Sequence, residues 1–251
     1  MRLLIIVNKS WNFINFRKEL IYLLNKKEFK VTLICEDKNK NLEIFRKMGC
    51  NLEFLGNNFF LNIIKIKTLL FKIKPEIVLN YTFKSIFCFT LSNLFLQIKS
   101  INTFSGLGYL FIKKKYTYAF LLFLIFCFTS NKKSIFLFHN NHDLKFFKRF
   151  HFIKKIKLIN INGSGVNTKN FNTSFFPIKT KKTHFLMVAR LLREKGIIEF
   201  CKAAKEIAYM NPNISFTLIV KTSLQNPGLI NFEEIEKDIL EAKIKYIENP
   251  R

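Results

Sequence analysis

Two basic residues stand where an apolar, strand-like run gives way to a helical pattern. Arg190 follows the run Met187–Ala189, and Lys195 precedes Gly196, at which a helix is predicted to begin. Ligands of open α/β sheets bind at the carboxyl ends of strands, and a helix N-terminus presents free N–H groups to an anion. A guanidinium clamps phosphate oxygens in bidentate fashion, and an ammonium adds a point charge. The pair therefore predicts a diphosphate site; the alternative is two solvated surface charges.

Two glycine-containing loops follow other strand-like runs. In Ser105-Gly106-Leu107-Gly108 the glycines allow a tight loop, and they also allow backbone N–H groups to contact a sugar or a phosphate. Gly163-Ser164-Gly165 lacks the third glycine and the directly following helix of a dinucleotide fingerprint. This second segment therefore predicts a hinge instead of a binding loop.

The histidines and aspartates predict no metal centre. His139 and His142 lie three positions apart, but only Asp143 stands near them and no cysteine does, which is too few ligands for zinc. Asp37, Asp143 and Asp238 are the only aspartates and are far apart in the sequence, which argues against a two-carboxylate site. We therefore expect no metal cofactor, and the spacing supports no Ser-His-Asp or Cys-His catalytic set.

Short apolar runs alternate with longer helical patterns over the first two thirds of the chain. The predicted strands are Leu3–Val7, Lys30–Cys35, Asn51–Leu55, Ile77–Asn80, Ile98–Thr103, Ser134–Phe138 and Lys157–Ile161. The predicted helices are Phe16–Asn25, Asn41–Lys47, Leu61–Ile73, Ser85–Leu96, Tyr116–Thr129 and Asn141–Phe150. Several strands are continuously apolar, as buried parallel strands are. The alternation predicts the α/β class, an open sheet with helices on both faces.

A second α/β pattern follows a segment without periodicity. Residues 170–182 carry Pro177 among Asn, Thr and Lys and are predicted to be a linker. Residues 183–251 then show a β-α-β-α-β order over His184–Ala189, Gly196–Met210, Ile214–Val220, Phe232–Ala242 and Ile244–Ile247. Because such sheets usually hold five or six strands, we expect a domain over residues 1–169 and a truncated second domain over 183–251.

The motifs resemble those of a known enzyme family. Ala189-Arg190-Leu191 followed by Glu194-Lys195-Gly196 is similar to the G-R-L-x-x-x-K-G signature of family-4 type retaining glycosyltransferases with the GT-B fold. The resemblance extends along nearly the whole chain. It includes Trp11-Asn12-Phe13 as an aromatic loop, Asn15-Phe16-Arg17 as an H/N-x-R helix start, Thr103–Tyr109 as the acceptor-side Gly-Leu-Gly loop, Gly163–Asn167 with Phe171 as the hinge motif, and Asn226-Pro227 with Glu233–Ile235 as an N-P-x-x-I segment.

This resemblance implies a GT-B type α/β fold of two Rossmann-like domains, the second incomplete, and a metal-independent transferase. A nucleotide sugar would be held by the C-terminal domain through Arg190, Lys195 and Asn226, with Arg190 and Lys195 as the catalytic residues that neutralise the leaving diphosphate. An acceptor would be held by the N-terminal domain through Asn15, Arg17, Ser105, Gly106, Gly108, His139 and Asn140. In the most similar subgroup, an N-acetylhexosamine or related sugar goes to a polyprenyl-diphosphate-linked glycan.

Some positions depart from the family pattern. Lys221 stands where relatives have a glycine beside the donor, and Asn167 replaces the hinge aspartate. The sequence ends before the E-x₇-E element that contacts the donor in relatives. The alternative function is therefore a catalytically incomplete fragment that binds an acceptor or a membrane surface.

The composition is that of a folded, strongly basic protein. Its 251 residues include 31 Phe and carry a formal net charge of +25, which excludes a disordered chain but not a biased composition rich in Lys. The clusters Lys65-Ile66-Lys67, Lys113–Lys115 and Lys154–Lys157 alternate with apolar residues. They favour either solvated faces or peripheral association with an anionic membrane surface. No RNA- or DNA-binding module is recognisable, so a nucleic-acid partner is not expected.

The remaining signals indicate a cytoplasmic protein, with peripheral association at the inner face of the membrane as the open alternative. The five cysteines are widely spaced and odd in number, which favours reduced, buried thiols. The N-terminal apolar run is too short for a signal peptide. Ala119–Phe128, the longest apolar stretch, is too short to span a bilayer and predicts a buried helix or shallow insertion.

Overall fold

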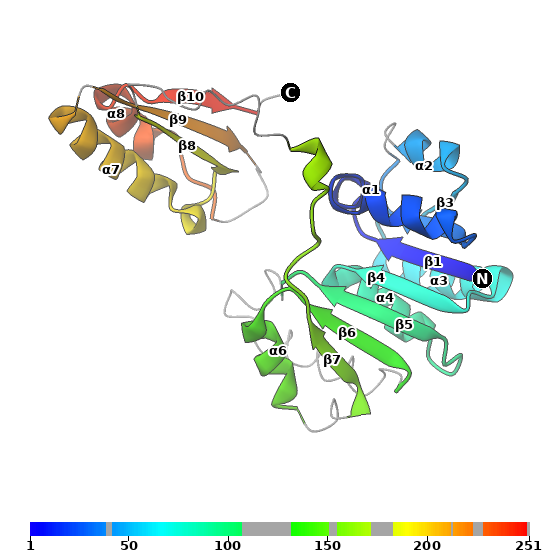
Figure 1. The fold of residues 1–251 in the computed structure, drawn as a ribbon. Helices are drawn as coiled ribbons and strands as arrows, with labels where there is room; N and C mark the ends of the chain where they lie inside the picture. Colours follow the sequence, from blue (N-terminus) through cyan, green and yellow to red (C-terminus); the bar gives the residue numbers. More distant parts are fainter. Residues whose placement is uncertain are drawn as a thin grey trace. The chain divides into compact units, whose positions relative to one another are not determined.

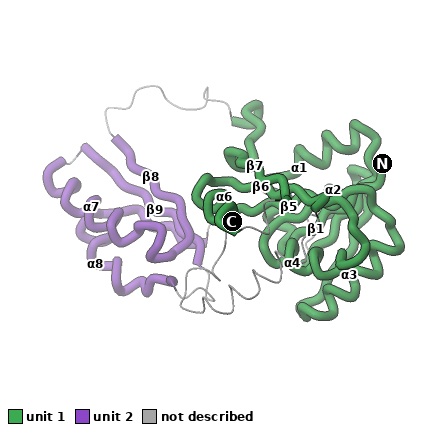
Figure 2. The backbone as a smooth tube through the Cα atoms, turned by 90° about the horizontal axis from the view of Figure 1, so that it is seen from below, with its two compact units in different colours: residues 1–171 green, residues 172–251 purple. Residues whose placement is uncertain are grey.

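The computed structural model describes residues 1–38, 42–106, 132–150, 155–171, 183–211, 213–222 and 228–249. The chain divides into two compact units, Met1–Phe171 and Asn172–Arg251 (Figure 2). The division falls within residues 170–182, the predicted linker, most of which lies outside the described residues. The predicted site residues Gly108 and Asn226 and the predicted helix Tyr116–Thr129 also lie outside them.

Unit 1 contains a seven-stranded sheet in which every adjacent pair is parallel. In chain order its strands are β1 (Arg2–Val7), β2 (Lys30–Cys35), β3 (Asn51–Phe54), β4 (Ile77–Tyr81), β5 (Lys99–Phe104), β6 (Ser134–Phe138) and β7 (Lys157–Asn160). Their spatial order is β3-β2-β1-β4-β5-β6-β7, so the chain reverses its direction of progress between β1 and β4 (Figure 1). Such a reversal opens a crevice at the carboxyl ends of the two strands. The predicted α/β class is confirmed.

Helices cover both faces of this sheet (Figure 1). On one face, α1 (Ser10–Lys26) and α2 (Glu43–Lys47) bury Phe13 and Phe45 in a core with alternate residues of β1 and β2. On the other, α3 (Phe59–Ile73) and α4 (Phe83–Ser92) pack against each other and against the remaining residues of those strands. α6 (Asn141–Lys148) contributes Phe147 to a phenylalanine-rich cluster with β5 and β6.

Two helix boundaries of unit 1 differ by four residues or more from the predicted ones, and the other boundaries of its described helices lie within two residues. α1 begins at Ser10, six residues before the predicted Phe16, because the Asp37 carboxylate, distant in sequence, accepts hydrogen bonds from Ser10. The predicted aromatic loop Trp11–Phe13 is therefore the first turn of a helix. α4 ends at Ser92 instead of Leu96, since the Asn93 side chain bonds the backbone N–H and C=O of Ile98 and turns the chain toward β5.

Unit 2 repeats the β-α-β design on a smaller scale. The strands β8 (Thr183–Arg190), β9 (Ile214–Lys221) and β10 (Lys245–Glu248) form a parallel sheet in the order β10-β9-β8. The helices α7 (Ile197–Met210) and α8 (Glu233–Glu241) contact each other and share one core with the sheet. Every boundary lies within one residue of the predicted one.

Cys35, Cys50, Cys88 and Cys201 are free and buried, as predicted, and Cys127 lies outside the described residues. Burial raises the pKa of Cys35 to about 12 and those of Cys88 and Cys201 to about 11. Among the described helices, none is long and apolar enough to cross a membrane. The apolar stretch Ala119–Phe128 belongs to the part of the chain that is not described.

Candidate functional site

The N-terminus of α7 is open. β8 ends at Arg190, a 3-10 turn spans Arg193–Lys195, and Gly196 enters the helix with a φ of +74°, a left-handed conformation that glycine adopts without strain. No described side chain caps the helix. Glu199 lies in the first turn without capping it, so the first N–H groups, which carry about half a positive charge in total, remain available to an anion.

The segment from the end of β8 to α7 carries three basic side chains, and two of them make no ion pair with a described residue. Arg193 is engaged: its guanidinium lies 2.5 Å from Glu234, and the other oxygen of that carboxylate accepts a 3.1 Å hydrogen bond from the Asn231 N–H. The hydrogen bond from Arg193 holds the pKa of Glu234 below its usual value. Arg190 and Lys195 are exposed, and within the described chain neither pairs with a carboxylate. The structure therefore leaves the two predicted residues available to a ligand.

Lys221 adds a third available cation at the same edge. It is the last residue of β9 and lies beside Arg190 in the parallel register, where its carbonyl accepts a hydrogen bond from the Leu191 N–H. Its side chain is exposed. Sequence comparison treats Lys221 only as a bulky replacement of glycine. The strand register, which pairs the ends of two predicted strands, is the signal that identifies it as part of a basic edge.

The corresponding helix of unit 1 is closed to anions. The Asp37 carboxylate, just beyond β2, accepts 2.7 Å hydrogen bonds from both the N–H and the hydroxyl of Ser10, the first residue of α1. The neighbouring Glu36 is paired with Lys84 at 2.5 Å. Both acids after β2 are therefore occupied within the protein, and one of them fills the place at which a phosphate would bind.

A second basic position lies at the crevice between β1 and β4. Arg17 of α1 is only 8% exposed, with its Cζ 4.1 Å from the ring centroid of Tyr81, the last residue of β4. The Asn12 side-chain oxygen accepts a 3.0 Å hydrogen bond from it. Burial lowers the pKa of Arg17, which Tyr81 partly offsets. No described carboxylate neutralises this guanidinium, and a buried unpaired cation is costly unless an anion accompanies it.

His139 stands near Arg17 with an unused nitrogen. The residue follows β6 and is half-buried, and its Nε2 is inaccessible to solvent and has no hydrogen-bond partner in the described chain. Burial lowers its pKa, and the charge of Arg17 lowers it further, so the imidazole is neutral at pH 7. Arg17 and His139 are therefore near enough for the charge of Arg17 to act on the imidazole, and the His139 Nε2 has no partner among the described residues.

The family of the chain follows from comparison with known proteins. A family model described as glycosyl transferase 4-like matches residues 2–140, more than half of the chain. The chain belongs to the glycosyl transferase 4-like family. The predicted enzyme class, glycosyltransferase, is confirmed at this level. No curated protein matches the sequence.

Solved structures with a similar fold include a synthase, a glycosyltransferase and an epimerase. The trehalose 6-phosphate synthase of Burkholderia multivorans is 10% identical with a TM-score of 0.70, covering 100% of this chain and 74% of that one. A glycosyltransferase of Rickettsia africae is 15% identical with a TM-score of 0.64, covering 99% and 68%. The UDP-GlcNAc 2-epimerase of Neisseria meningitidis, bound to UDP-GlcNAc, is 15% identical with a TM-score of 0.61, covering 100% and 73%. These likenesses confirm the GT-B type α/β fold.

The other predicted acceptor-side residues of this glycosyl transferase 4-like chain differ in exposure and in whether their side chains are already hydrogen-bonded. Asn140 caps α6, because its side-chain oxygen accepts from the Asp143 N–H and its amide donates to the Asp143 carboxylate. The Asn15 amide donates to the Trp11 carbonyl on the exposed side of α1. Ser105 is exposed, and Gly106 has a φ of +154°. Tyr81, which sequence reasoning missed, is recognisable as the last residue of the strand after the reversal.

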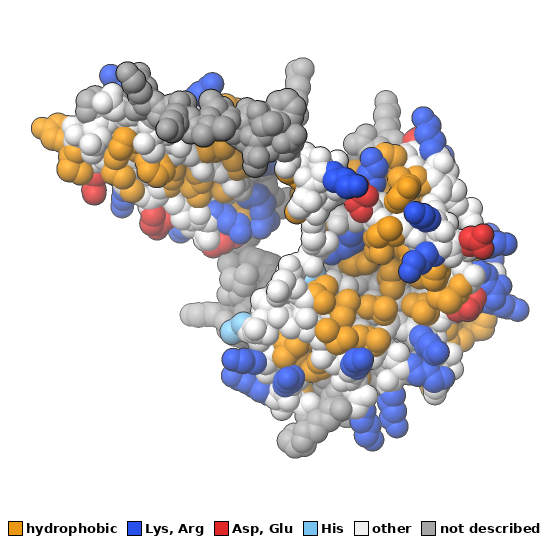
Figure 3. Space-filling model, in the orientation of Figure 1, with side chains coloured by type: hydrophobic (Ala, Val, Ile, Leu, Met, Phe, Trp, Pro, Cys, Tyr) orange, Lys and Arg blue, Asp and Glu red, His pale blue; other side chains and the backbone are white. Residues whose placement is uncertain are grey.

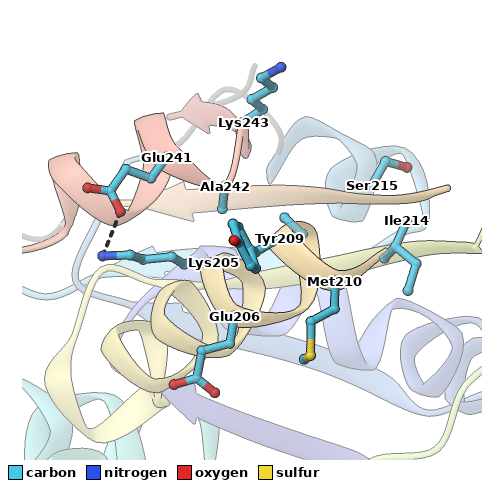
Figure 4. Close-up of a pocket in the computed structure, with 10 residues that line it drawn as sticks. Lys205, Glu206, Tyr209, Met210, Ile214, Ser215, Glu241, Ala242 and Lys243 are labelled. Carbon is cyan, nitrogen blue, oxygen red and sulfur yellow. Dashed lines mark ion pairs between the residues drawn. The ribbon is translucent and has the colours of Figure 1, made fainter. Parts of the chain in front are cut away.

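A cavity of about 770 Å³ lies at the other end of the unit 2 sheet (Figure 4). The end of α7, the start of β9 and the end of α8 line it, and the Lys205–Glu241 ion pair of 2.6 Å lies at its margin. Ile214 begins β9 here, whereas Arg190 ends β8 at the opposite edge. Because ligands of parallel sheets bind at the carboxyl ends of strands, the edge with Arg190, and not this cavity, is the candidate ligand site.

Proposed function

We propose that the chain transfers a sugar, most simply an N-acetylhexosamine, from a nucleoside-diphosphate donor to a polyprenyl-diphosphate-linked glycan. The reaction retains the anomeric configuration, uses no metal, and takes place in the cytoplasm at the inner face of the membrane. The observation that carries the proposal is the open N-terminus of α7 with the unpaired Arg190 and Lys195 beside it.

The donor edge supplies what departure of a diphosphate requires. The bond between the anomeric carbon and the donor phosphate oxygen breaks, the acceptor hydroxyl oxygen bonds to the same face of that carbon, and the hydroxyl proton passes to the departing diphosphate. Negative charge grows on the diphosphate as the bond breaks. Arg190, Lys195 and the N–H groups of α7 stabilise that charge, which is the contribution that a divalent cation makes in other transferases.

At the proposed acceptor edge the cation is buried instead of exposed. Arg17 is buried and lacks a described carboxylate partner, so it suits one anionic group held out of water, such as the diphosphate of a lipid-linked glycan. His139 is neutral and offers a nitrogen to a hydroxyl. An acceptor that carries both a diphosphate and sugar hydroxyls matches this pair.

Calorimetric titration with UDP and UDP-GlcNAc tests the donor assignment. UDP is the first nucleotide to try because a structural neighbour holds UDP-GlcNAc. We expect the unchanged chain to bind, and the double variant Arg190→Ala/Lys195→Ala to bind about 100-fold more weakly, since two charge-assisted hydrogen bonds are lost. EDTA should leave the affinity unchanged.

Arg193→Ala is the matched control for that titration. It removes one positive charge from the same edge but from a side chain already paired with Glu234. Its affinity for UDP should stay close to that of the unchanged chain. If UDP binds equally to all variants, or binds to none including the unchanged chain, the donor assignment fails and the non-catalytic binding module remains.

A further inference from the structure

Positive charge alone does not identify a docking surface on this protein. Lys and Arg side chains are scattered over the face drawn in Figure 3 instead of being gathered in one patch. The helix α3 carries lysines on both sides of large apolar side chains that point to solvent. Phe60, Leu61, Ile64 and Phe71 are 74%, 62%, 62% and 56% exposed.

The exposed residues of α3 are ordered around the helix. At about 100° per residue, Phe60, Ile64 and Phe71 fall within about 40° of one another. Leu61 follows beyond Thr68, whose hydroxyl donates to the Ile64 carbonyl. Lys67 borders this stripe on one side, and Lys65 and Lys72 border it on the other. α3 contains no acidic residue. An apolar stripe flanked by lysines is the pattern of a helix that lies in a membrane interface, with its lysine heads at the phosphate level.

Unit 1 holds α3 in this orientation. The inner residues Ile66, Leu69 and Leu70 are buried against the sheet and α4. Asn62, which is 1% exposed, bonds both the N–H and the C=O of Gly56, and the Ser92 hydroxyl donates to the Ile63 carbonyl. The apolar stripe therefore cannot turn inward without breaking buried hydrogen bonds.

α1 provides the internal contrast. It too exposes large apolar side chains, Trp11, Phe16, Tyr22 and Leu23. The polar residues Asn15, Glu19 and Lys26 divide them at about 100° per residue, so they form no continuous stripe. A charged carboxylate in the middle of a face opposes its burial in lipid.

We propose that the outer face of α3 is the surface by which this chain docks on an anionic lipid bilayer, with Phe60, Ile64 and Phe71 inserted at acyl-chain level. The inference deepens the proposed function, because a lipid-linked acceptor must be met at a bilayer. The charge of this face favours lipid as the occupant. Three lysines and no acidic residue of α3 flank the apolar stripe, whereas a protein partner would need acidic residues around an apolar groove to match it.

Vesicle flotation of the whole chain tests the proposal. With phosphatidylcholine vesicles containing roughly one-third phosphatidylglycerol, we expect binding that pure phosphatidylcholine does not support. Lys65→Gln/Lys67→Gln/Lys72→Gln should lower partitioning about 100-fold, since each lysine near an anionic surface contributes about fivefold. The control Lys18→Gln/Lys26→Gln/Lys27→Gln removes the same charge from the α1 side of the sheet and should bind nearly as before.

A second readout reports insertion directly. Phe60→Trp in a Trp11→Phe background places the only tryptophan on the stripe, and its emission should shift to the blue when anionic vesicles are added. Phe60→Ser/Ile64→Ser/Phe71→Ser should bind at least tenfold more weakly. Circular dichroism of each variant checks that it is folded.

Three outcomes overturn the proposal: no binding to anionic vesicles, equal loss in the α1 control, or a concentration-dependent dimer that the Ser variant abolishes without any vesicle binding. The last would make the face an interface between two copies. Flotation needs no nucleotide, and calorimetry with UDP needs no lipid. Failure of docking and failure of the donor assignment are therefore seen separately.

Discussion

The helices that follow the first strand of each unit differ in the residues beside their N-termini. At α1, the neighbouring strand β2 is followed by Glu36 and Asp37, and Asp37 occupies the helix N-terminus through Ser10. At α7, the neighbouring strand β9 ends on Lys221, and Arg190 and Lys195 flank an uncapped helix. Both units share the same β-α-β architecture. The fold offers an anion site twice, and the residues after the second strand decide which one stays open.

The difference also separates the roles of the two units. Unit 2 presents exposed cations and free helix N–H groups, which suit a solvated diphosphate that must enter and leave. Unit 1 keeps its basic residue, Arg17, buried beside Tyr81 and away from the α1 N-terminus. Under the proposed function, the two units would bind phosphate in two ways, at a helix N-terminus in unit 2 and at a buried guanidinium in unit 1.

The largest change is expected when the Asp37 carboxylate is removed from the N-terminus of α1. Asp37→Ala removes two hydrogen bonds from the first turn and should lower the free energy of unfolding by roughly 1–2 kcal/mol. Urea denaturation monitored by circular dichroism measures it. Asp37→Asn retains one acceptor oxygen and should lose less. A loss as large in Asp37→Asn as in Asp37→Ala would contradict the capping role.

An acidic residue after β9, like Asp37 after β2, should weaken nucleotide binding at the proposed donor edge. Lys221→Asp places a carboxylate beside Arg190 at the end of β9, and we expect UDP affinity to fall about tenfold or more, because opposite charges about 8 Å apart interact by about 2 kcal/mol at an effective dielectric constant of about 20. Lys243→Asp, at the far edge near the cavity, makes the same charge change and should have little effect. Equal loss in both variants would point to net charge instead of position.

A side chain at Gly196 should strain the backbone where α7 begins. Its φ of +74° lies in the left-handed region, and an added Cβ meets only the Glu199 carboxylate, at 3.8 Å, so the cost is conformational. Gly196→Ala should destabilise the protein by about 1 kcal/mol, and Gly196→Asn by less because asparagine adopts this conformation more readily. Thermal unfolding of both variants measures the difference, and an Ala variant as stable as the Asn variant would rule the explanation out.

The smallest effect is expected from His139. Its pKa in the folded protein is lowered, first by burial and then by Arg17. Between that lowered value and the unfolded value near 6.5, the unfolded chain binds more protons. This contribution to stability is therefore complete above pH 6.5 and is lost as the pH falls through the folded pKa. His139→Gln should show a shallower decline of stability between pH 7 and pH 5, and NMR titration of His139 should give a pKa below 6.5.

Local pattern predicted most of the fold because the period of apolar residues reflects burial directly. The strands Lys30–Cys35 and Ser134–Phe138 have the predicted bounds. α1 was the exception, since its first turn depends on a carboxylate 27 residues away, and α4 ended early because of the Asn93 side chain. The first contact leaves no local signal in the sequence, whereas the second joins residues only five positions apart, at the boundary between a helix and a strand.

By itself, the amino-acid sequence determined the α/β class, the positions of nearly all strands, and the two cations Arg190 and Lys195 at the start of a helix. These depend on periodicity and on neighbours along the chain. Only the tertiary structure decided which cations remain available, because that depends on which carboxylates reach them: Glu234 engages Arg193 and leaves Arg190 free, and Asp37 closes α1. Parallel register and burial likewise placed Lys221 at the donor edge and Arg17 beside Tyr81 and His139, since residues far apart in sequence meet only when the sheet has formed.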